Sequence, residues 1–98
     1  MKLEFKSKKL QNICTNASVA EKEYGSRMAE LIHQRIDEIT AADTVEMLLK
    51  FRVGRCHALK GNLHGKYAMD LAHPFRLIFI KKGVEIQVVK IVDIADYH

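Results

Sequence analysis

The second half of the chain alternates β-branched and polar residues over a length that only a β-sheet accommodates. The segment "FRLIFIK" at 75–81 is apolar on both faces, as a central strand is. The segment "VEIQVVKIVDI" at 84–94 is rich in Val and Ile, which favour strands. A turn at 81–83 separates the two segments, so we expect them to lie side by side in one sheet.

The first half has the period of a helix instead. Its clearest helix covers 26–42, where four apolar residues recur at steps of three and four and form one stripe. Capping patterns predict three shorter helices, whose N-cap residues are Ser7, Ser18 and Asp43. Gly25 is expected to separate the second helix from the third.

Further strands are predicted at 3–6, 52–59 and 66–72. Pro74 falls between two strands, where it needs no ladder hydrogen bond. The pattern predicts an α+β domain in which an N-terminal strand and helices pack on a mostly antiparallel sheet. Because the chain has 98 residues, we expect a single domain, 1–98.

The sequence also predicts the compartment. Cys14 and Cys56 belong to no C-x-x-C pair, and the N-terminus shows no apolar signal-peptide core. The longest aliphatic or aromatic run, "LIFI", is too short to span a membrane. We therefore expect a cytoplasmic protein with reduced cysteines and no membrane association.

The basic residues are unevenly distributed. Residues 1–50 carry eight basic and eight acidic side chains, whereas residues 51–98 carry eight and four. No acid occurs between Met47 and Met69. The cationic and imidazole residues of that stretch are Lys50, Arg52, Arg55, His57, Lys60, His64 and Lys66. Such a cluster attracts polyanions, so we predict a nucleic-acid partner bound in part by Arg52, Arg55 and Lys66.

The residues do not favour a metal site or another cofactor. No two histidines have the spacing of a zinc-binding helix, and Cys56 and His57 are neighbours that point in opposite directions on a strand. Carboxylates near the histidines are too few for a two-metal nuclease.

Acid–base chemistry without metal fits the composition better. Cleavage of an RNA phosphodiester needs a base for the 2′-hydroxyl, cations for the negative charge of the phosphorane, and an acid for the leaving oxygen. Histidine can fill either proton-transfer role near neutral pH. Arg76, which interrupts the most apolar stretch of the chain, has two interpretations: it pairs with Asp70, or it binds a phosphate.

Two segments carry a family resemblance. "GRCHALKGNLHGKYAMDLAHPFRLIFI" at 54–80 and "VVKIVDIADYH" at 88–98 resemble the RelE/ParE superfamily of bacterial toxins, and most closely its HigB-type branch. The resemblance implies a RelE-like fold and a ribosome-dependent mRNA endoribonuclease of a type II toxin–antitoxin system. It also implies a hetero-oligomer with a cognate helix-turn-helix antitoxin.

By position, the resemblance implies catalytic roles for His57, Lys60, Arg76, Asp96, Tyr97 and His98. Strict alternation would place His57 and Lys60 on opposite faces of one strand, so we expect that strand to end or bulge near Leu59. The final segment must fold back towards His57.

Two alternatives remain open at this point. A ParE-like inhibitor of DNA gyrase would use the same fold, although its branch generally lacks the histidine-rich ending. A non-catalytic RNA-binding domain would explain the basic stretch but not the terminal triplet. In either case, apolar residues beyond the helical stripe are expected to pack internally or to receive a partner segment: Leu31, Val45, Leu48, Leu49 and Phe51.

Overall fold

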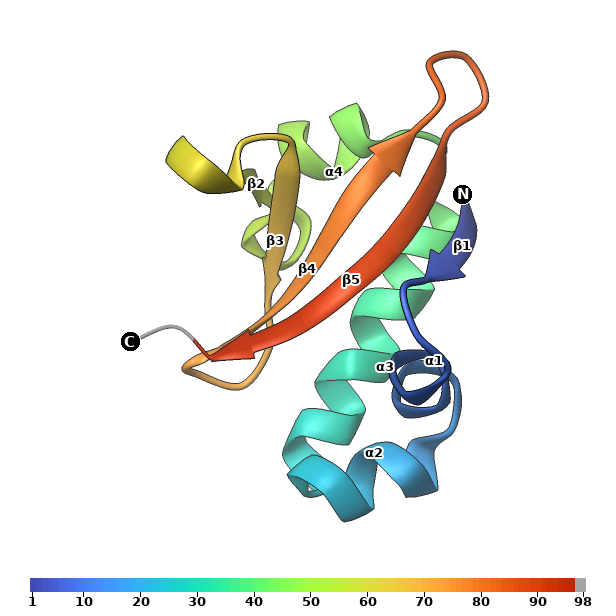
Figure 1. Ribbon diagram of the computed structural model, residues 1–98, viewed down its shortest axis with the longest axis vertical. Coiled ribbons are helices and arrows are strands. Elements are labelled where there is room, and N and C mark those ends of the chain that lie inside the picture. The colour runs from blue at the N-terminus through green and yellow to red at the C-terminus, as the bar shows by residue number, and fades with distance from the viewer. Residues whose placement is uncertain (97–98) are drawn as a thin grey trace.

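A computed structural model describes residues 1–96 of the chain and contains a five-stranded sheet and four α-helices (Figure 1). The helices are α1 (Lys8–Thr15), α2 (Ala17–Tyr24), α3 (Ser26–Ala41) and α4 (Val45–Lys50). The strands are β1 (Lys2–Phe5), β2 (His57–Ala58), β3 (Lys66–Asp70), β4 (Phe75–Lys82) and β5 (Val88–Asp96). Short 3₁₀ turns cover Val53–Arg55 and Gly61–Leu63.

The sheet order is β1-β5-β4-β3-β2, which places β4 at the centre as its two apolar faces predict. β1 pairs with β5 in parallel, and the other three pairs are antiparallel. The predicted α+β fold class is therefore confirmed. β5 and the connection between β3 and β4 end at the same edge of the molecule (Figure 1).

Two strand predictions were wrong in extent. β5 begins at Val88, because residues 83–87 form the connection from β4, with Gly83 at φ 85°. β2 has only two residues, because the chain before it turns through Arg52, Gly54 and Arg55, which all have positive φ.

Two cap predictions were wrong by one or two positions. The N-cap of α2 is Asn16, whose side-chain oxygen accepts from the backbone N–H groups of Ser18 and Val19 at 3.0 and 3.4 Å. The N-cap of α4 is Thr44 rather than Asp43, and its hydroxyl accepts from the Met47 N–H at 3.2 Å. In both cases a nearby side chain that also caps helices accepts the hydrogen bonds of the free N–H groups at the helix start. The Ser7 cap of α1 is confirmed.

The core lies between the helices and one face of the sheet. Phe79 of β4 and Ile91 of β5 are fully buried against Ile32 and Ile39 of α3. Because strand side chains alternate, the intervening residues point to the other face. We call this second face the open face: in β3 and β4 it carries Lys66, Ala68, Asp70, Arg76, Ile78 and Ile80, of which Ala68 and Ile78 are buried.

The remaining apolar predictions divide between core and surface. Leu31, Val45 and Leu48 are buried in the core and Leu49 packs partly against it, whereas the Phe51 side chain stays exposed. Both cysteines are free and buried, and burial raises the pKa of the Cys14 and Cys56 thiols to about 12 and about 11. Among residues 1–96, no helix is long and apolar enough to cross a bilayer.

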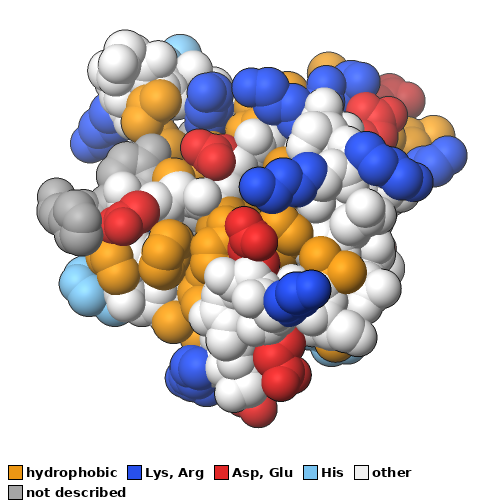
Figure 2. Space-filling view, turned by 60° about the horizontal axis from the view of Figure 1, so that its bottom comes forward, with side chains coloured by type: hydrophobic (Ala, Val, Ile, Leu, Met, Phe, Trp, Pro, Cys, Tyr) orange, Lys and Arg blue, Asp and Glu red, His pale blue; other side chains and the backbone are white. Residues whose placement is uncertain are grey.

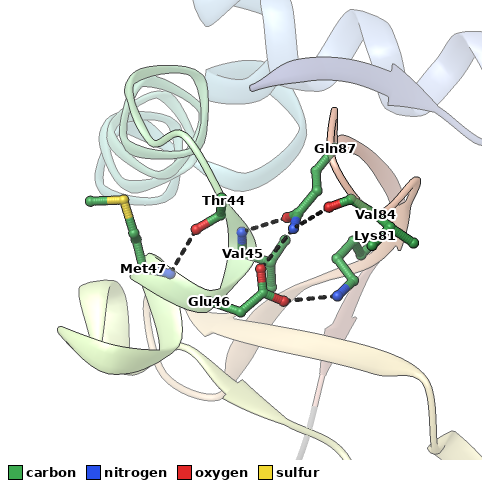
Figure 3. A network of polar contacts seen from close by, with 7 residues as sticks. All are labelled: Thr44, Val45, Glu46, Met47, Lys81, Val84 and Gln87. Carbon is green, nitrogen blue, oxygen red and sulfur yellow. Dashed lines mark hydrogen bonds and ion pairs between the residues drawn. The ribbon is translucent and has the colours of Figure 1, made fainter.

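A polar network joins α4 to the β4–β5 connection (Figure 3). The Gln87 side chain is almost completely buried; its Oε1 accepts from the Val45 N–H at 2.8 Å, and its Nε2 donates to Glu46 Oε1 at 2.7 Å. Glu46 Oε2 accepts from Lys81 Nζ at 2.8 Å. The network satisfies a buried helix N–H and fixes the connection against α4.

Candidate functional site

The open face gathers candidate residues from neighbouring strands. Asp70 of β3 lies directly opposite Arg76 of β4, and Arg76 lies opposite Ala95 of β5. His57 of β2 lies opposite Ala68, one step along the same face. Antiparallel pairing therefore brings a histidine and an arginine that are far apart in sequence onto one surface.

At the end of β3, Asp70 lies between two arginines. Its Oδ1 is 3.8 Å from Arg76 Nε, and its Oδ2 is 3.3 Å from Arg55 Nε. The side chains of Asp70 and Arg76 are 29% and 33% exposed, so both groups are half withdrawn from water yet accessible. We call Arg55, Asp70 and Arg76 the arginine cluster; its formal charge is positive.

The two interpretations of Arg76 turn out to be compatible. Arg76 does pair with Asp70, as the structural interpretation predicts. The same guanidinium lies on the accessible open face, beside a hollow of about 180 Å³ lined in part by Arg55, His73 and Pro74. The structure therefore shows the pairing with Asp70, and phosphate binding by Arg76 stays a prediction.

Arg35 of α3 supports the cluster from behind. Its side chain is only 12% exposed, its Nε donates to the backbone carbonyl of Asp70 at 2.7 Å, and its Nη1 donates to Glu38 at 2.8 Å. Gly54 packs on the same guanidinium: a Cβ at this position would lie 2.5 Å from Arg35 Nε. One largely buried arginine thus contacts both the turn before β2 and the end of β3.

The hydrogen bond of His57 defines its proton position. His57 Nδ1 lies 2.8 Å from the carbonyl oxygen of Arg55. Because a carbonyl only accepts, Nδ1 carries a proton, and in the neutral imidazole Nε2 keeps its lone pair. His57 therefore has the tautomer of a base whose accepting atom is Nε2.

The other predicted site residues are less closely joined. β2 ends at Ala58, near Leu59 as expected, and Lys60 is an exposed residue at the start of the Gly61–Leu63 turn. Between described residues, no hydrogen bond or ion pair connects Lys60 to His57 or to the arginine cluster. Asp96 ends β5 opposite Phe75. Tyr97 and His98 lie outside the described residues.

The predicted RNA-binding residues surround the cluster. Arg52 is exposed at φ 51°, in the turn that also places Arg55. Lys66 begins β3 opposite Ile80 on the open face. Non-glycine residues with positive φ are uncommon, and two arginines in one turn in this conformation mark a locally strained segment.

Sequence reasoning missed two supporting groups. The sequence pattern of α3 gives Arg35 no special role, and only its contacts with Asp70 and Glu38 reveal one. Asp70 was considered solely as a partner of Arg76, because the contact with Arg55 depends on the turn before β2. Within residues 1–96, no three His, Cys, Asp or Glu side chains lie close enough together to hold a metal ion.

A different kind of hollow lies between α1, α2 and the end of β5. It measures about 220 Å³ and is lined in part by Leu10, Ile13, Tyr24 and Ile94. Figure 2 brings the lower end of the molecule forward and shows hydrophobic side chains gathered in its middle, with acidic and basic side chains around them. The lining of this hollow is mixed, because it also includes Ser7, Lys9 and Asp93.

Solved structures share this fold across the whole chain. The chain is similar to a YoeB/ParE toxin from Agrobacterium tumefaciens, with a TM-score of 0.68 and 17% identity over 100% of both chains. It is also similar to a YoeB–YefM complex from Staphylococcus aureus, with a TM-score of 0.65 and 19% identity. A YoeB dimer from the same organism gives a TM-score of 0.64 and 19% identity. Both staphylococcal comparisons cover 100% of this chain and 97% of the other.

These comparisons confirm the fold that the family resemblance implied. At identities of 17% and 19% they establish the fold and leave activity to the site itself. No protein-family model matches the sequence, and no curated protein matches it.

Proposed function

We propose that the protein is the toxin of a type II toxin–antitoxin system, of the HigB-like branch, and that it cleaves mRNA on the ribosome in the cytoplasm. The observation that carries the proposal is the arginine cluster beside His57 on the open face of a sheet whose fold matches YoeB/ParE toxins. Cations and an imidazole on one accessible surface are what metal-independent cleavage of RNA requires.

His57 acts as the base in this proposal. Its Nδ1 donates to the Arg55 carbonyl, so Nε2 is the atom that takes the proton of the 2′-hydroxyl. Arg76 stabilises the negative charge that develops on the phosphorane, and Lys60 adds a second cation from its turn.

The final residues complete the reaction. His98 protonates the leaving 5′-oxygen, Asp96 orients an imidazole, and Tyr97 stacks on a nucleotide. Arg52, Arg55 and Lys66 bind flanking phosphates, which makes RNA affinity depend on salt.

Induction in growing bacteria tests the activity. We expect the wild-type protein to arrest growth and to produce new 5′ ends on a translated message, detected by primer extension. His57→Ala is expected to abolish both effects. His33 is an exposed histidine of α3 that pairs with Asp37, and His33→Ala is expected to leave both effects intact. Deletion of Tyr97 and His98 is expected to act like His57→Ala. Full cleavage by His57→Ala would reject the proposed site.

A gyrase supercoiling assay with purified protein separates the ParE-like alternative. Inhibition of gyrase without any effect on translating ribosomes would replace the proposed activity with that one. Salt-sensitive RNA binding without cleavage would leave a non-catalytic RNA-binding domain.

We also propose that a helix-turn-helix antitoxin binds the protein. A solved YoeB–YefM complex from S. aureus contains a chain with the same fold as this protein. Here the Phe51 and Met47 side chains are 64% and 42% exposed and border an apolar hollow of about 300 Å³ beside α4. Exposed aliphatic and aromatic side chains at a hollow are typical of partner contacts.

Copurification with the product of a neighbouring gene tests the partner. We expect Phe51→Asp to weaken the complex while the cleavage activity of the isolated protein stays unchanged. A protein that accumulates to high levels in growing cells without any partner would contradict the antitoxin proposal.

A further inference from the structure

Asp70 is an acid at the heart of the arginine cluster, a surface that should attract phosphates. A carboxylate there repels RNA, so its presence needs an explanation other than binding. Stability does not explain the contact with Arg55, because Arg55 is 71% exposed and ion pairs with exposed arginines contribute little to folding.

The geometry of Asp70 suggests what it does. Each carboxylate oxygen faces a different arginine, Oδ1 towards Arg76 and Oδ2 towards Arg55. Both contacts are made at Nε, the inner nitrogen of the guanidinium, so the terminal nitrogens lie farther along each side chain. A single carboxylate thus contacts two guanidiniums that come from different elements.

The position of Asp70 is itself fixed. Its carbonyl oxygen accepts from Arg35 Nε at 2.7 Å, and it is the last residue of β3, paired with Arg76. Immediately after it, the Leu71 N–H donates to the Phe75 carbonyl at 3.0 Å and closes the connection to β4. The carboxylate is therefore presented to the arginines from a rigid strand end.

Resting on the proposed function, we propose that Asp70 is a positioning residue: it aligns the Arg76 guanidinium for the phosphate undergoing cleavage and the Arg55 guanidinium for a flanking phosphate. Such a role separates binding from catalysis. Asp70→Asn removes a negative charge, which favours RNA binding, but it also releases the two guanidiniums from their alignment, which slows the chemical step.

The test measures both quantities on the same protein. Single-turnover cleavage on mRNA-programmed ribosomes at saturating toxin gives the rate constant, and titration of a fluorescent RNA over a range of salt gives the affinity. We expect Asp70→Asn to lower the cleavage rate constant about 10- to 100-fold and to leave the RNA Kd unchanged or lower. Equal losses in rate and affinity, or an unchanged rate, would overturn the positioning role.

Asp37→Asn is the matched control. Asp37 lies on α3, where its carboxylate contacts His33 at 3.4 Å and is 68% exposed. The substitution changes the net charge by the same amount away from the open face. We expect its cleavage rate constant to equal that of the wild type; a tenfold loss in this variant would show that charge alone, and not alignment, explains Asp70→Asn.

A spectroscopic measurement tests the alignment of the two arginines independently of RNA cleavage. In ¹⁵N-labelled protein we expect the Arg55 and Arg76 Nε–H groups to be more ordered in the wild type than in Asp70→Asn, as shown by their heteronuclear relaxation. Equal order in both proteins would overturn the inference whether or not RNA is cleaved. Ordered arginines in a wild type that cleaves no message would overturn the proposed function and, with it, the catalytic purpose of the alignment.

Discussion

Two clusters of charged and polar groups join neighbouring elements of the molecule, and they are built differently. In the network between α4 and the β4–β5 connection, Glu46 accepts hydrogen bonds of 2.7 and 2.8 Å from Gln87 and Lys81 (Figure 3). In the arginine cluster, the contacts of Asp70 are ion pairs of 3.3 and 3.8 Å.

The difference distinguishes polar groups that stabilise the fold from polar groups that we propose act in cleavage. Gln87 is buried and uses its whole amide for Val45, Glu46 and Val84, so its network has one arrangement. The arginine cluster is partly exposed, and Asp70 contacts each arginine at Nε, so the terminal nitrogens can bind a phosphate while the ion pairs persist. Substitutions should therefore impair stability in the first cluster and activity in the second.

Arg76→Ala should show the largest effect, and it should appear in activity alone. We expect the cleavage rate constant to fall roughly 10²- to 10³-fold, because the substitution removes a preorganised cation from the developing charge. The thermal midpoint should change little. Quantified primer extension together with thermal unfolding checks both points; a variant that cleaves at the wild-type rate would remove the arginine cluster from the reaction.

Gly54→Ala tests the packing of the Arg35 side chain against the turn before β2. The new Cβ would collide with the Arg35 guanidinium, at a backbone position with φ 56°. We expect the free energy of unfolding to fall by about 2–3 kcal/mol, measured by urea denaturation. Gly61→Ala is the control, since Gly61 has a similar φ of 65° but open space at its Cβ. An equal loss in both variants would show that backbone strain alone, and not Arg35, is responsible.

Gln87→Ala should destabilise the network between α4 and the β4–β5 connection without affecting RNA cleavage. The Val45 N–H, which is buried, loses its acceptor. We expect the free energy of unfolding to fall by about 1–2 kcal/mol, while the folded protein keeps its cleavage rate constant. Gln34→Ala, which removes an exposed amide 3.5 Å from Glu38, is expected to change neither quantity. A cleavage defect in Gln87→Ala would contradict the separation of the two clusters.

The smallest effect concerns the pH dependence of the stability that the network between α4 and the β4–β5 connection contributes. Hydrogen bonds from Gln87 and Lys81 lower the pKa of the Glu46 carboxyl to about 2 from 4.5. A lowered folded-state pKa means that this stabilisation is complete above pH 4.5 and is lost as the pH falls through 2. Thermal midpoints measured from pH 5 to 2 should therefore converge for the wild type and Glu46→Gln as acid is added. A constant difference across this range would contradict the assignment.

Local sequence patterns predicted most of the fold. The alternation in 75–81 identified β4 as the central strand, and the four-residue stripe identified α3. The errors arose where distant contacts overrule local preference. Val84 and Ile86 favour a strand, yet they lie in the β4–β5 connection, because Gly83 turns the chain and Gln87 is bound to α4.

The site was less predictable for the same reason. The sequence singled out Arg76 but left open whether it pairs with Asp70, because strand register decides that question and register depends on the whole sheet. Arg35 carries no local signal at all: its role depends on reaching the end of β3 from α3, 35 residues away in the chain.

The chemistry of the RNA ends tests the central claim most directly. If His57 and the arginine cluster activate the 2′-hydroxyl, cleaved mRNA carries a 2′,3′-cyclic phosphate or its hydrolysis product and a 5′-hydroxyl, and Arg76→Ala produces neither. Fragments that carry 5′-phosphates and 3′-hydroxyls would mean that water is the nucleophile, which contradicts the account.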